Sequence, residues 1–384
     1  MEKLFLAAIC AVVPGLGRAK VPAALERLGS AQALFEASSE ELAKLNLFSE
    51  GQINAFCTGR EQVNPLALEQ FCSRYGVRLL SIYDEDYPLS LRQIADPPLL
   101  LYVRGQLPKA DYAVAIVGSR MASAYGLRAA DAFAAALAGK GIAIISGGAK
   151  GIDTAAHEAC LRAKGQTVAV LGCGLDIAYP AENLGLFNRI VASGGAVISE
   201  YPPGVQPLAR NFPARNRIVV GLCQGVLVAE AARKSGALIT ANIAADEGRD
   251  VFCVPGNIFD NTSIGCHDLI RNGAKLVDTP ADILEDRNNW RLCNGKSMRQ
   301  PSIFDFTTKE TADAPPVPKA QASKLPPMSE LGARLYGLLQ GGALTLEALT
   351  EQSGADFASV SMELLELQVA QLVTQDQARR YCRR

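Results

Sequence analysis

Small and cationic residues follow a short apolar run of this sequence at a point where they could bind phosphate. Gly118-Ser119-Arg120 comes directly after the β-prone residues 114–117 and before a helix that we expect to begin near Tyr125. A strand, a tight turn and a helix in this order direct backbone N–H groups toward an anion. An arginine in the turn can donate to two phosphate oxygens at once. For one such turn alone, selection for packing is the alternative.

Further turns of the same composition follow other apolar runs. The turn SGGAK spans 146–150, and RKSG spans 233–236. Glycine lets a ligand approach the main chain closely, because a Cβ would hold it away. Arg210, Arg215 and Arg217 lie in a segment without strand character, which we expect to be a loop at the same rim. Cations clustered with glycine turns indicate a phosphate-bearing ligand.

The elements that must position these turns form a regular series. Apolar runs alternate with helix-like segments of about a dozen residues. Strands are expected at 113–117, 142–146, 167–171, 195–199, 225–230 and 250–254. This alternation predicts an α/β fold with a doubly wound parallel sheet. Ligands of such sheets bind beyond the carboxyl ends of the strands, which is where the glycine turns fall.

The regions that flank this core differ from it. The N-terminal region has helical periodicity, interrupted by PGLG at 14–17 before Arg18 and Lys20. This turn resembles a helix-hairpin-helix, whose glycine amides can contact a nucleic-acid backbone, and a purely structural helical bundle is the alternative. Short strands after Val77 are expected to edge the main sheet.

The C-terminal part of the chain divides into two segments. The first is rich in Pro, Ser, Thr, Lys and Ala, which is typical of a flexible linker. The second recovers helical periodicity in three short helices followed by a polar hairpin, a pattern that resembles a winged helix and allows a DNA-binding or a protein-docking role. The expected organisation is therefore a helical domain at 1–75, the α/β domain at 76–290, a linker at 291–327 and a winged-helix-like domain at 328–384.

Composition limits the function classes. A net charge of −1 means that any nucleic-acid binding must come from a local basic patch. Ten cysteines without a C-x-x-C pair and only two histidines argue against a metal site. The first turn lacks the dinucleotide-binding G-x-G-x-x-G, and no P-loop motif occurs. Because Pro14 and Gly15 interrupt the apolar N-terminal run, we expect a buried helix, no membrane contact and a cytoplasmic protein.

Longer motifs resemble one family, DNA-processing protein A (DprA/Smf), over nearly the whole chain. They are IVGSR at 116–120, SGGAKGIDTAAH at 146–157, TVAVLGCGLDIAYPAEN at 167–183, ISEYPPG at 198–204, FPARNRIVVGL at 212–222, VLVAEAARKSGALITANIAADEGRDVFCVPG at 226–256 and GCHDLIRNGAKLV at 265–277. The resemblance implies an extended Rossmann-like domain, here with an N-terminal helical (SAM- or helix-hairpin-helix-like) domain. The flanking regions vary most within the family, so no role is transferred to 1–75 or 328–384.

What the family resemblance implies is a protein without enzymatic activity or cofactor. Such a protein binds and protects incoming single-stranded DNA and loads the RecA recombinase onto it during natural transformation. It also implies a homodimer formed through the late part of the Rossmann-like domain. The expected interface residues are His267, Leu269, Ile270 and Leu276. An apolar face at a sheet edge is covered either by the chain itself or by a partner, and the resemblance favours the partner.

The same resemblance and the residue types agree on a DNA-binding rim. Phosphates are expected on Ser119, Arg120 and Lys150, with Asn216 and Phe212 available for base contact or stacking. For Phe212, a core position is the favoured reading. The full expected set is Gly118, Ser119, Arg120, Gly147, Gly148, Lys150, Phe212, Arg215, Asn216, Arg217, Lys234, Ser235 and Gly236.

A nucleotide-binding protein or nucleoside-monophosphate glycosidic hydrolase of related Rossmann-like fold is the alternative function. The SGGAKGID turn could hold a phosphoribosyl group, and Glu200 or Glu230 could supply a carboxylate. The P-G-G-x-G-T-x-x-E signature of those families is missing, since EAARKSGA stands at 230–237. Neither His157 nor His267 is paired with an evident nucleophile, and a structural role is the favoured reading of both.

Overall fold

The computed structural model describes residues 1–12, 20–286, 290, 329–341, 344–369, 372–375 and 380–383. The expected hairpin at 14–17 with Arg18, and the expected linker at 291–327, lie outside these residues. The chain divides into two compact units, Met1–Ile303 and Phe304–Arg384, and each is described by itself. None of the helices in the described ranges has the length and apolarity that a bilayer crossing needs.

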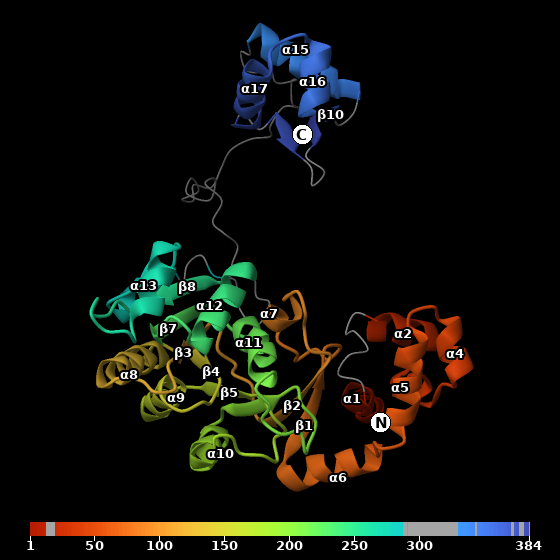
Figure 1. Ribbon diagram of the computed structural model, residues 1–384, viewed down its shortest axis with the longest axis vertical. Coiled ribbons are helices and arrows are strands. Elements are labelled where there is room, and N and C mark those ends of the chain that lie inside the picture. Colours follow the sequence, from red (N-terminus) through yellow and green to blue (C-terminus); the bar gives the residue numbers. More distant parts are fainter. Residues whose placement is uncertain are drawn as a thin grey trace, which may run out of the picture. The chain divides into compact units, whose positions relative to one another are not determined.

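Nine strands of the described chain form one mixed sheet in the first unit (Figure 1). They are β1 (Val77–Ser81), β2 (Leu100–Gly105), β3 (Ala113–Gly118), β4 (Ala143–Ser146), β5 (Thr167–Leu171), β6 (Ala196–Ser199), β7 (Gly225–Glu230), β8 (Asp250–Cys253) and β9 (Lys275–Leu276). Their order in space is β1-β2-β6-β5-β4-β3-β7-β8-β9. Strands β3 to β9 pair in parallel, whereas β2 pairs antiparallel with both β1 and β6. The predicted α/β fold is confirmed, and the early strands lie at one edge of its sheet.

Helices cover both faces of this sheet. The helices that follow the parallel strands are α8 (Ala124–Gly139), α9 (Ile152–Arg162), α10 (Leu184–Ala192), α11 (Asn211–Gly221), α12 (Gly236–Asp246), α13 (Ile264–Arg271) and α14 (Pro280–Asp286), with the short α7 (Leu89–Arg92) and η1 (Ala181–Asn183) between strands. Alternate residues of β3 enter different cores: Val114 and Ile116 pack with α8 and α9, while Ala115 and Val117 pack with α11 and α12. Burial on both faces explains why these strands are almost continuously apolar.

Six helices of the described residues precede the sheet. They are α1 (Glu2–Val12), α2 (Lys20–Leu28), α3 (Ala31–Glu36), α4 (Ser39–Lys44), α5 (Glu50–Arg60) and α6 (Pro65–Tyr75). Ser30, Ser38 and Ser49 each cap a helix by accepting a hydrogen bond from the backbone N–H three residues later. Phe5 and Ile9 of α1 share one core with Tyr102 of β2. A domain boundary after residue 75 stays a proposal, because α1 and the sheet belong to one compact unit.

The second unit is small and has its own core. Its described elements are α15 (Glu330–Leu338), η4 (Leu339–Gly341), β10 (Leu344–Thr345), α16 (Leu346–Ser353), α17 (Phe357–Val369), β11 (Val373–Gln375) and β12 (Arg380–Arg383). The strands form an antiparallel sheet in the order β10-β12-β11. Leu335, Leu349, Val360 and Leu364 are completely buried between the helices.

Candidate functional site

The sheet topology opens a cleft where the strand order reverses. From β3 the chain adds β4, β5 and β6 on one side and then returns to add β7 and β8 on the other. The connections after β3 and β7 therefore diverge, which leaves a crevice at the carboxyl ends of the strands. A cleft of about 500 Å³ lies there, between the turns after β3, β4 and β7 and the first half of α11.

Most of the predicted rim residues line this cleft. They are Gly118, Ser119, Arg120, Gly147, Phe212, Arg215, Asn216, Lys234, Ser235 and Gly236. Gly148, Lys150 and Arg217 do not line it. Asp153 and Met121 also line the cleft and were not expected there. Asp153 belongs to the SGGAKGID turn, but its negative charge is not a feature that a phosphate-binding pattern predicts.

Arg120 and Phe212 lie together at one wall. The Cζ atom of Arg120 is 5.0 Å from the centroid of the Phe212 ring. The centroid of the Tyr179 ring is 5.5 Å from the centroid of the same Phe212 ring. Phe212 is half-buried and lines the cleft, so the favoured reading of a core position is wrong. An arginine beside a half-buried aromatic ring that lines a cleft combines a phosphate ligand with a surface for stacking.

Arg215 forms the floor of the cleft and is almost completely buried, with 5% of the residue exposed. Its Nη1 donates to the carbonyl oxygen of Gly147, at 2.6 Å, and to that of Val170. Its Nε donates to no atom of the described chain. A Cβ on Gly147 would lie 2.5 Å from Nη2 of Arg215, so the arginine itself requires this glycine.

Asp153 holds the turn above Arg215. Its Oδ2 accepts hydrogen bonds from the backbone N–H groups of Gly147 and Ala149, at 3.1 and 3.2 Å. Burial raises the pKa of Asp153, while the charge of Arg215 and these amide hydrogen bonds lower it. Asp153 and Arg215 therefore both hold the SGGAK turn, Asp153 by accepting from its amides and Arg215 by donating to the carbonyl oxygen of Gly147.

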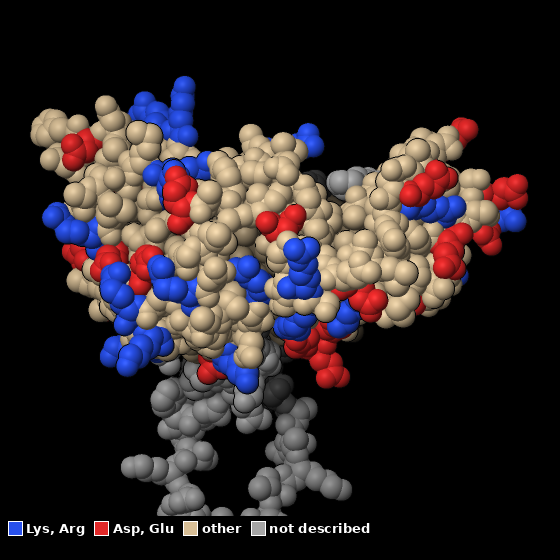
Figure 2. Space-filling model, turned by 90° about the horizontal axis from the view of Figure 1, so that it is seen from below, with Lys and Arg blue, Asp and Glu red and all other residues tan. Residues whose placement is uncertain are grey.

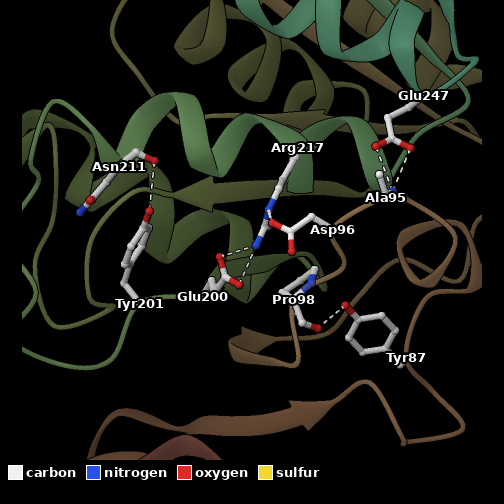
Figure 3. Close-up of polar contacts among 9 residues, drawn as sticks. All are labelled: Tyr87, Ala95, Asp96, Pro98, Glu200, Tyr201, Asn211, Arg217 and Glu247. Atoms are coloured by element: carbon white, nitrogen blue, oxygen red, sulfur yellow. Dashed lines mark hydrogen bonds and ion pairs between the residues drawn. The ribbon is translucent and has the colours of Figure 1, made fainter. Parts of the chain in front are cut away.

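The three arginines expected on a loop are in fact at the start of and within a helix. Arg210 is the N-cap residue of α11, and Arg215 and Arg217 lie inside α11. Because successive helix residues are about 100° apart around the axis, residues two positions apart face different sides. Arg215 reaches the cleft, whereas the prediction that Arg217 lines it is wrong. Arg217 is 9% exposed, and it donates to Asp96 and to Glu200 (Figure 3).

A second group of cleft residues comes from the start of α12. Ser235 is the N-cap residue and accepts a hydrogen bond from the backbone N–H of Ala237, at 3.3 Å. Gly236 is the first helical residue, and Lys234 precedes the cap and is exposed. A helix N-terminus with an adjacent lysine favours an anion.

Basic side chains on one face of the molecule do not form one continuous field (Figure 2). On the face shown in Figure 2, basic and acidic side chains are interspersed. Lys150 is an example, because its Nζ lies 2.5 Å from Oε1 of Glu182, with both side chains more than half exposed. On that face, positive charge is therefore divided by acidic groups (Figure 2).

The carboxylates that a hydrolase would need are engaged elsewhere. Glu230 is 2% exposed and accepts hydrogen bonds from the backbone N–H of Ser123, at 3.0 Å, and from the Ser123 hydroxyl. It thereby holds the start of α8. Glu200 is paired with Arg217. Neither residue lines the cleft. Within the described part of the chain, no group of three or more His, Cys, Asp or Glu side chains is arranged to hold a metal ion.

The two histidines have partners inside the fold. His157 is completely buried, and its Nδ1 lies 2.7 Å from the hydroxyl of Thr167. Because that hydroxyl donates to the carbonyl oxygen of Ile144, at 2.7 Å, Nδ1 must carry the proton. The Nε2 of His267 lies 3.0 Å from the carbonyl oxygen of Gly256.

His157 makes the fold sensitive to acid. Burial, with a smaller contribution from the charge of Arg215, lowers the pKa of His157 from 6.5 to about 3. The unfolded chain therefore binds the proton first, so stability is present above pH 6.5 and is lost as the pH falls toward 3. We expect the free energy of unfolding to fall by about 2 kcal/mol between pH 7 and pH 5 from this residue alone. Urea unfolding at both pH values measures it, and His157→Gln should remove most of the difference; an equal loss in that variant would contradict the assignment.

The residues expected at a dimer interface lie late in the unit. Leu269 and Ile270 of α13 are half-buried and pack against the core that contains Cys266. Leu276, at the end of β9, is 47% exposed. The chain thus covers part of this apolar face and leaves part of it accessible.

Comparison with known proteins gives consistent results. Residues 78–288 match the family model described as DNA recombination-mediator protein A. The chain is 50% identical over 207 residues to DNA processing protein DprA of Streptococcus pneumoniae, covering 54% of this chain and 73% of that protein. It is 34% identical over 389 residues to Protein Smf of Synechocystis, covering 97% and 96% of the two chains.

Two solved structures are also similar. The X-ray structure of DNA processing protein A from Streptococcus pneumoniae has a TM-score of 0.63 and 39% identity, and covers 74% of this chain and 98% of that one. A structure of DNA processing protein A from Helicobacter pylori has a TM-score of 0.51 and 30% identity, and covers 56% and 98%. The latter is described as giving insights into a unique single-stranded DNA binding mode of that protein.

Proposed function

Because the chain belongs to the DNA recombination-mediator protein A family, we propose that it binds single-stranded DNA in the cleft at the carboxyl ends of β3, β4 and β7. The observation that carries the proposal is the convergence of cations, a helix N-terminus and an aromatic ring in that cleft. Cationic grooves with accessible aromatic faces are typical of single-strand binders.

Two elements supply the phosphate ligands in this proposal. Arg120 and the Ser119 hydroxyl come from the turn after β3, and Lys234 and Ser235 come from the start of α12. These groups lie on the two connections that diverge from the strand crevice. A DNA backbone that crosses the cleft would meet a cation at each wall, Arg120 at one and Lys234 at the other.

Phe212 and Asn216 are the proposed base contacts. Both come from the first half of α11 and line the cleft. A base stacked against Phe212 would lie next to the guanidinium of Arg120. Stacking of this kind contributes about 1–3 kcal/mol per base and tolerates any base, since every base has a π-face.

The test is a salt titration with single-stranded and double-stranded oligonucleotides of equal length. We expect tighter binding to the single strand, with log K falling by about 0.7 per phosphate contact as log salt rises. Fluorescence anisotropy measures both. Equal affinity for the two forms, or no binding to either, would overturn the proposed function.

A binding role without catalysis is part of the proposal. Glu230 accepts hydrogen bonds from Ser123, and Glu200 pairs with Arg217. Neither carboxylate therefore lies in the cleft, where a catalytic base would be needed. Incubation with nucleoside monophosphates should release no base above a buffer control. Turnover that Glu230→Gln abolishes would favour the hydrolase instead.

The ion pair between Lys150 and Glu182 gives a further prediction. Glu182 neutralises a lysine of the SGGAK turn, so Lys150 must leave it before it can meet a phosphate. Glu182→Gln should therefore tighten single-strand binding by about fivefold near 0.1 M salt and steepen the salt slope by about 0.7, the effect of one added contact. Lys150→Ala in the Glu182→Gln background should cancel the gain. An unchanged slope in Glu182→Gln would show that Lys150 does not reach the DNA.

The more specific role that the family implies also remains a proposal. The description of the family as a recombination mediator supports the loading of RecA onto the bound strand, with protection of incoming DNA during natural transformation in the cytoplasm.

The half-exposed Leu276 beside α13 supports a homodimer through His267, Leu269 and Ile270. Light scattering of the full chain measures its mass. The helix, strand, two helices and hairpin of the second unit support a winged-helix-like domain.

A further inference from the structure

A network of polar contacts holds α11 on a side that does not line the cleft (Figure 3). The Nη2 of Arg217 donates to both oxygens of Glu200, at 2.7 and 2.8 Å, and its Nε donates to Oδ2 of Asp96, at 2.9 Å. The side chains of Arg217 and Glu200 are only 11% and 12% exposed. Shielding from water strengthens such a pair and makes its geometry restrictive.

The segment that carries Asp96 also holds α12. The backbone N–H of Ala95 donates to both oxygens of Glu247, the C-cap residue of α12, at 3.0 and 3.2 Å. The hydroxyl of Tyr87 donates to the carbonyl oxygen of Pro98, at 2.7 Å, and so holds the end of the segment. We call residues 94–98 the strap, because their hydrogen bonds to Arg217 of α11 and to Glu247 of α12 link the two helices.

The turn after β6 holds α11 at a second place. Glu200 directly follows the last residue of β6, and the hydroxyl of the next residue, Tyr201, donates to the carbonyl oxygen of Asn211, at 3.3 Å. No side chain caps the N-terminus of α11, since its N-cap residue Arg210 forms no capping hydrogen bond. These contacts therefore add to the core packing of Ile218, Val219 and Val220 in fixing the position of α11.

Both helices that the strap connects contribute to the cleft. The first half of α11 carries Phe212 and Asn216, and the start of α12 follows Lys234 and Ser235. A shift of α11 by one residue along its axis moves its side chains by about 1.5 Å, which exceeds the tolerance of about 0.5 Å for a preorganised site.

We infer that Arg217 is a positioning residue for DNA binding, which through Glu200 and Asp96 sets the separation between the base contacts on α11 and the phosphate contacts before α12. The inference rests on the proposed function of the cleft. It reassigns the arginine that sequence alone placed on phosphate. Arg217 acts on the DNA through the position of α11 and makes no contact with it.

The salt dependence of binding separates positioning from phosphate contact. A lost phosphate contact flattens the slope of log K against log salt. A displaced α11 that keeps the phosphate contacts instead weakens binding equally at every salt concentration. We expect Arg217→Lys and Glu200→Gln to lower the affinity for an oligothymidine about tenfold with an unchanged slope. Asp96→Asn should lower the affinity by a smaller factor, because the side chain of Asp96 is 49% exposed. Arg217→Lys keeps the positive charge and loses the planar guanidinium that bridges two carboxylates.

Controls make each outcome informative. Arg162 forms an exposed ion pair with Asp131 on α8, so Arg162→Lys should change neither the affinity nor the salt slope. Thermal unfolding identifies any variant that fails to fold, and Glu200→Gln then replaces Arg217→Lys as the test. A flatter slope in Arg217→Lys, or normal affinity in folded Arg217→Lys and Glu200→Gln, would overturn the inference while the wild type still binds. Failure of the wild type to bind would instead overturn the proposed function, and the inference with it.

Discussion

Replacement of both Arg120 and Lys234 by alanine is expected to weaken single-stranded DNA binding about 25-fold near 0.1 M salt and to lower the salt slope by about 1.4. The two side chains come from opposite connections of the cleft and are both exposed, so each is free of the buried contacts that hold Arg215 and Arg217. Each lost contact removes about 0.7 from the slope, which corresponds to about fivefold in affinity at that salt concentration. Anisotropy titrations of an oligothymidine at several salt concentrations measure both quantities.

The matched control keeps the change in charge but moves it away from the cleft. Arg162 and Lys140 are exposed residues of α9 and the α8 C-cap, and neither lines the cleft. Their double alanine variant should bind like the wild type except for a small change in long-range attraction. If the two double variants lose affinity equally, only the net charge matters and the cleft is not the binding site. If Arg120 alone accounts for the whole effect, Lys234 is not a phosphate ligand.

Replacement of Arg215 by methionine is expected to lower the free energy of unfolding by about 3–5 kcal/mol. The guanidinium compensates the buried charge of Asp153 and satisfies the carbonyl oxygens of Gly147 and Val170. Methionine fills part of the same volume but leaves the carboxylate without its opposite charge. Urea unfolding at neutral pH measures the loss, and DNA binding by the remaining folded protein should also weaken, because the SGGAK turn loses its support.

A second substitution tests the reason for this loss. Because a buried pair is costly mainly when one partner remains, Asp153→Asn should recover much of the stability of Arg215→Met. The asparagine side-chain oxygen can still accept from the backbone N–H groups of Gly147 and Ala149. Arg210→Met, at the exposed N-cap of the same helix, should cost less than about 0.5 kcal/mol. A loss below about 1 kcal/mol for Arg215→Met would show that its buried contacts are weak.

The sequence by itself determined the strands, the turns between them and the family. The apolar runs at 113–117, 167–171 and 225–230 coincide with β3, β5 and β7 to within one residue. Such runs are readable because strands covered on both faces need apolar residues at almost every position. The rule that parallel strands end at one rim then brought Arg120, the SGGAK turn and Lys234 together without coordinates.

Only the tertiary structure decided what each arginine does. The sequence predicts a loop around α11, because the first half of this segment is polar and contains Pro213; the structure forms a helix there, since the first turn of a helix tolerates proline. Once it is a helix, two residues of separation turn Arg215 toward the cleft floor and Arg217 toward Glu200 and Asp96. These partners lie up to 121 residues away in sequence, so no local pattern reveals them. The type of a charged side chain indicates what it can bind, but its burial and its partners, which depend on distant segments, determine what it does bind.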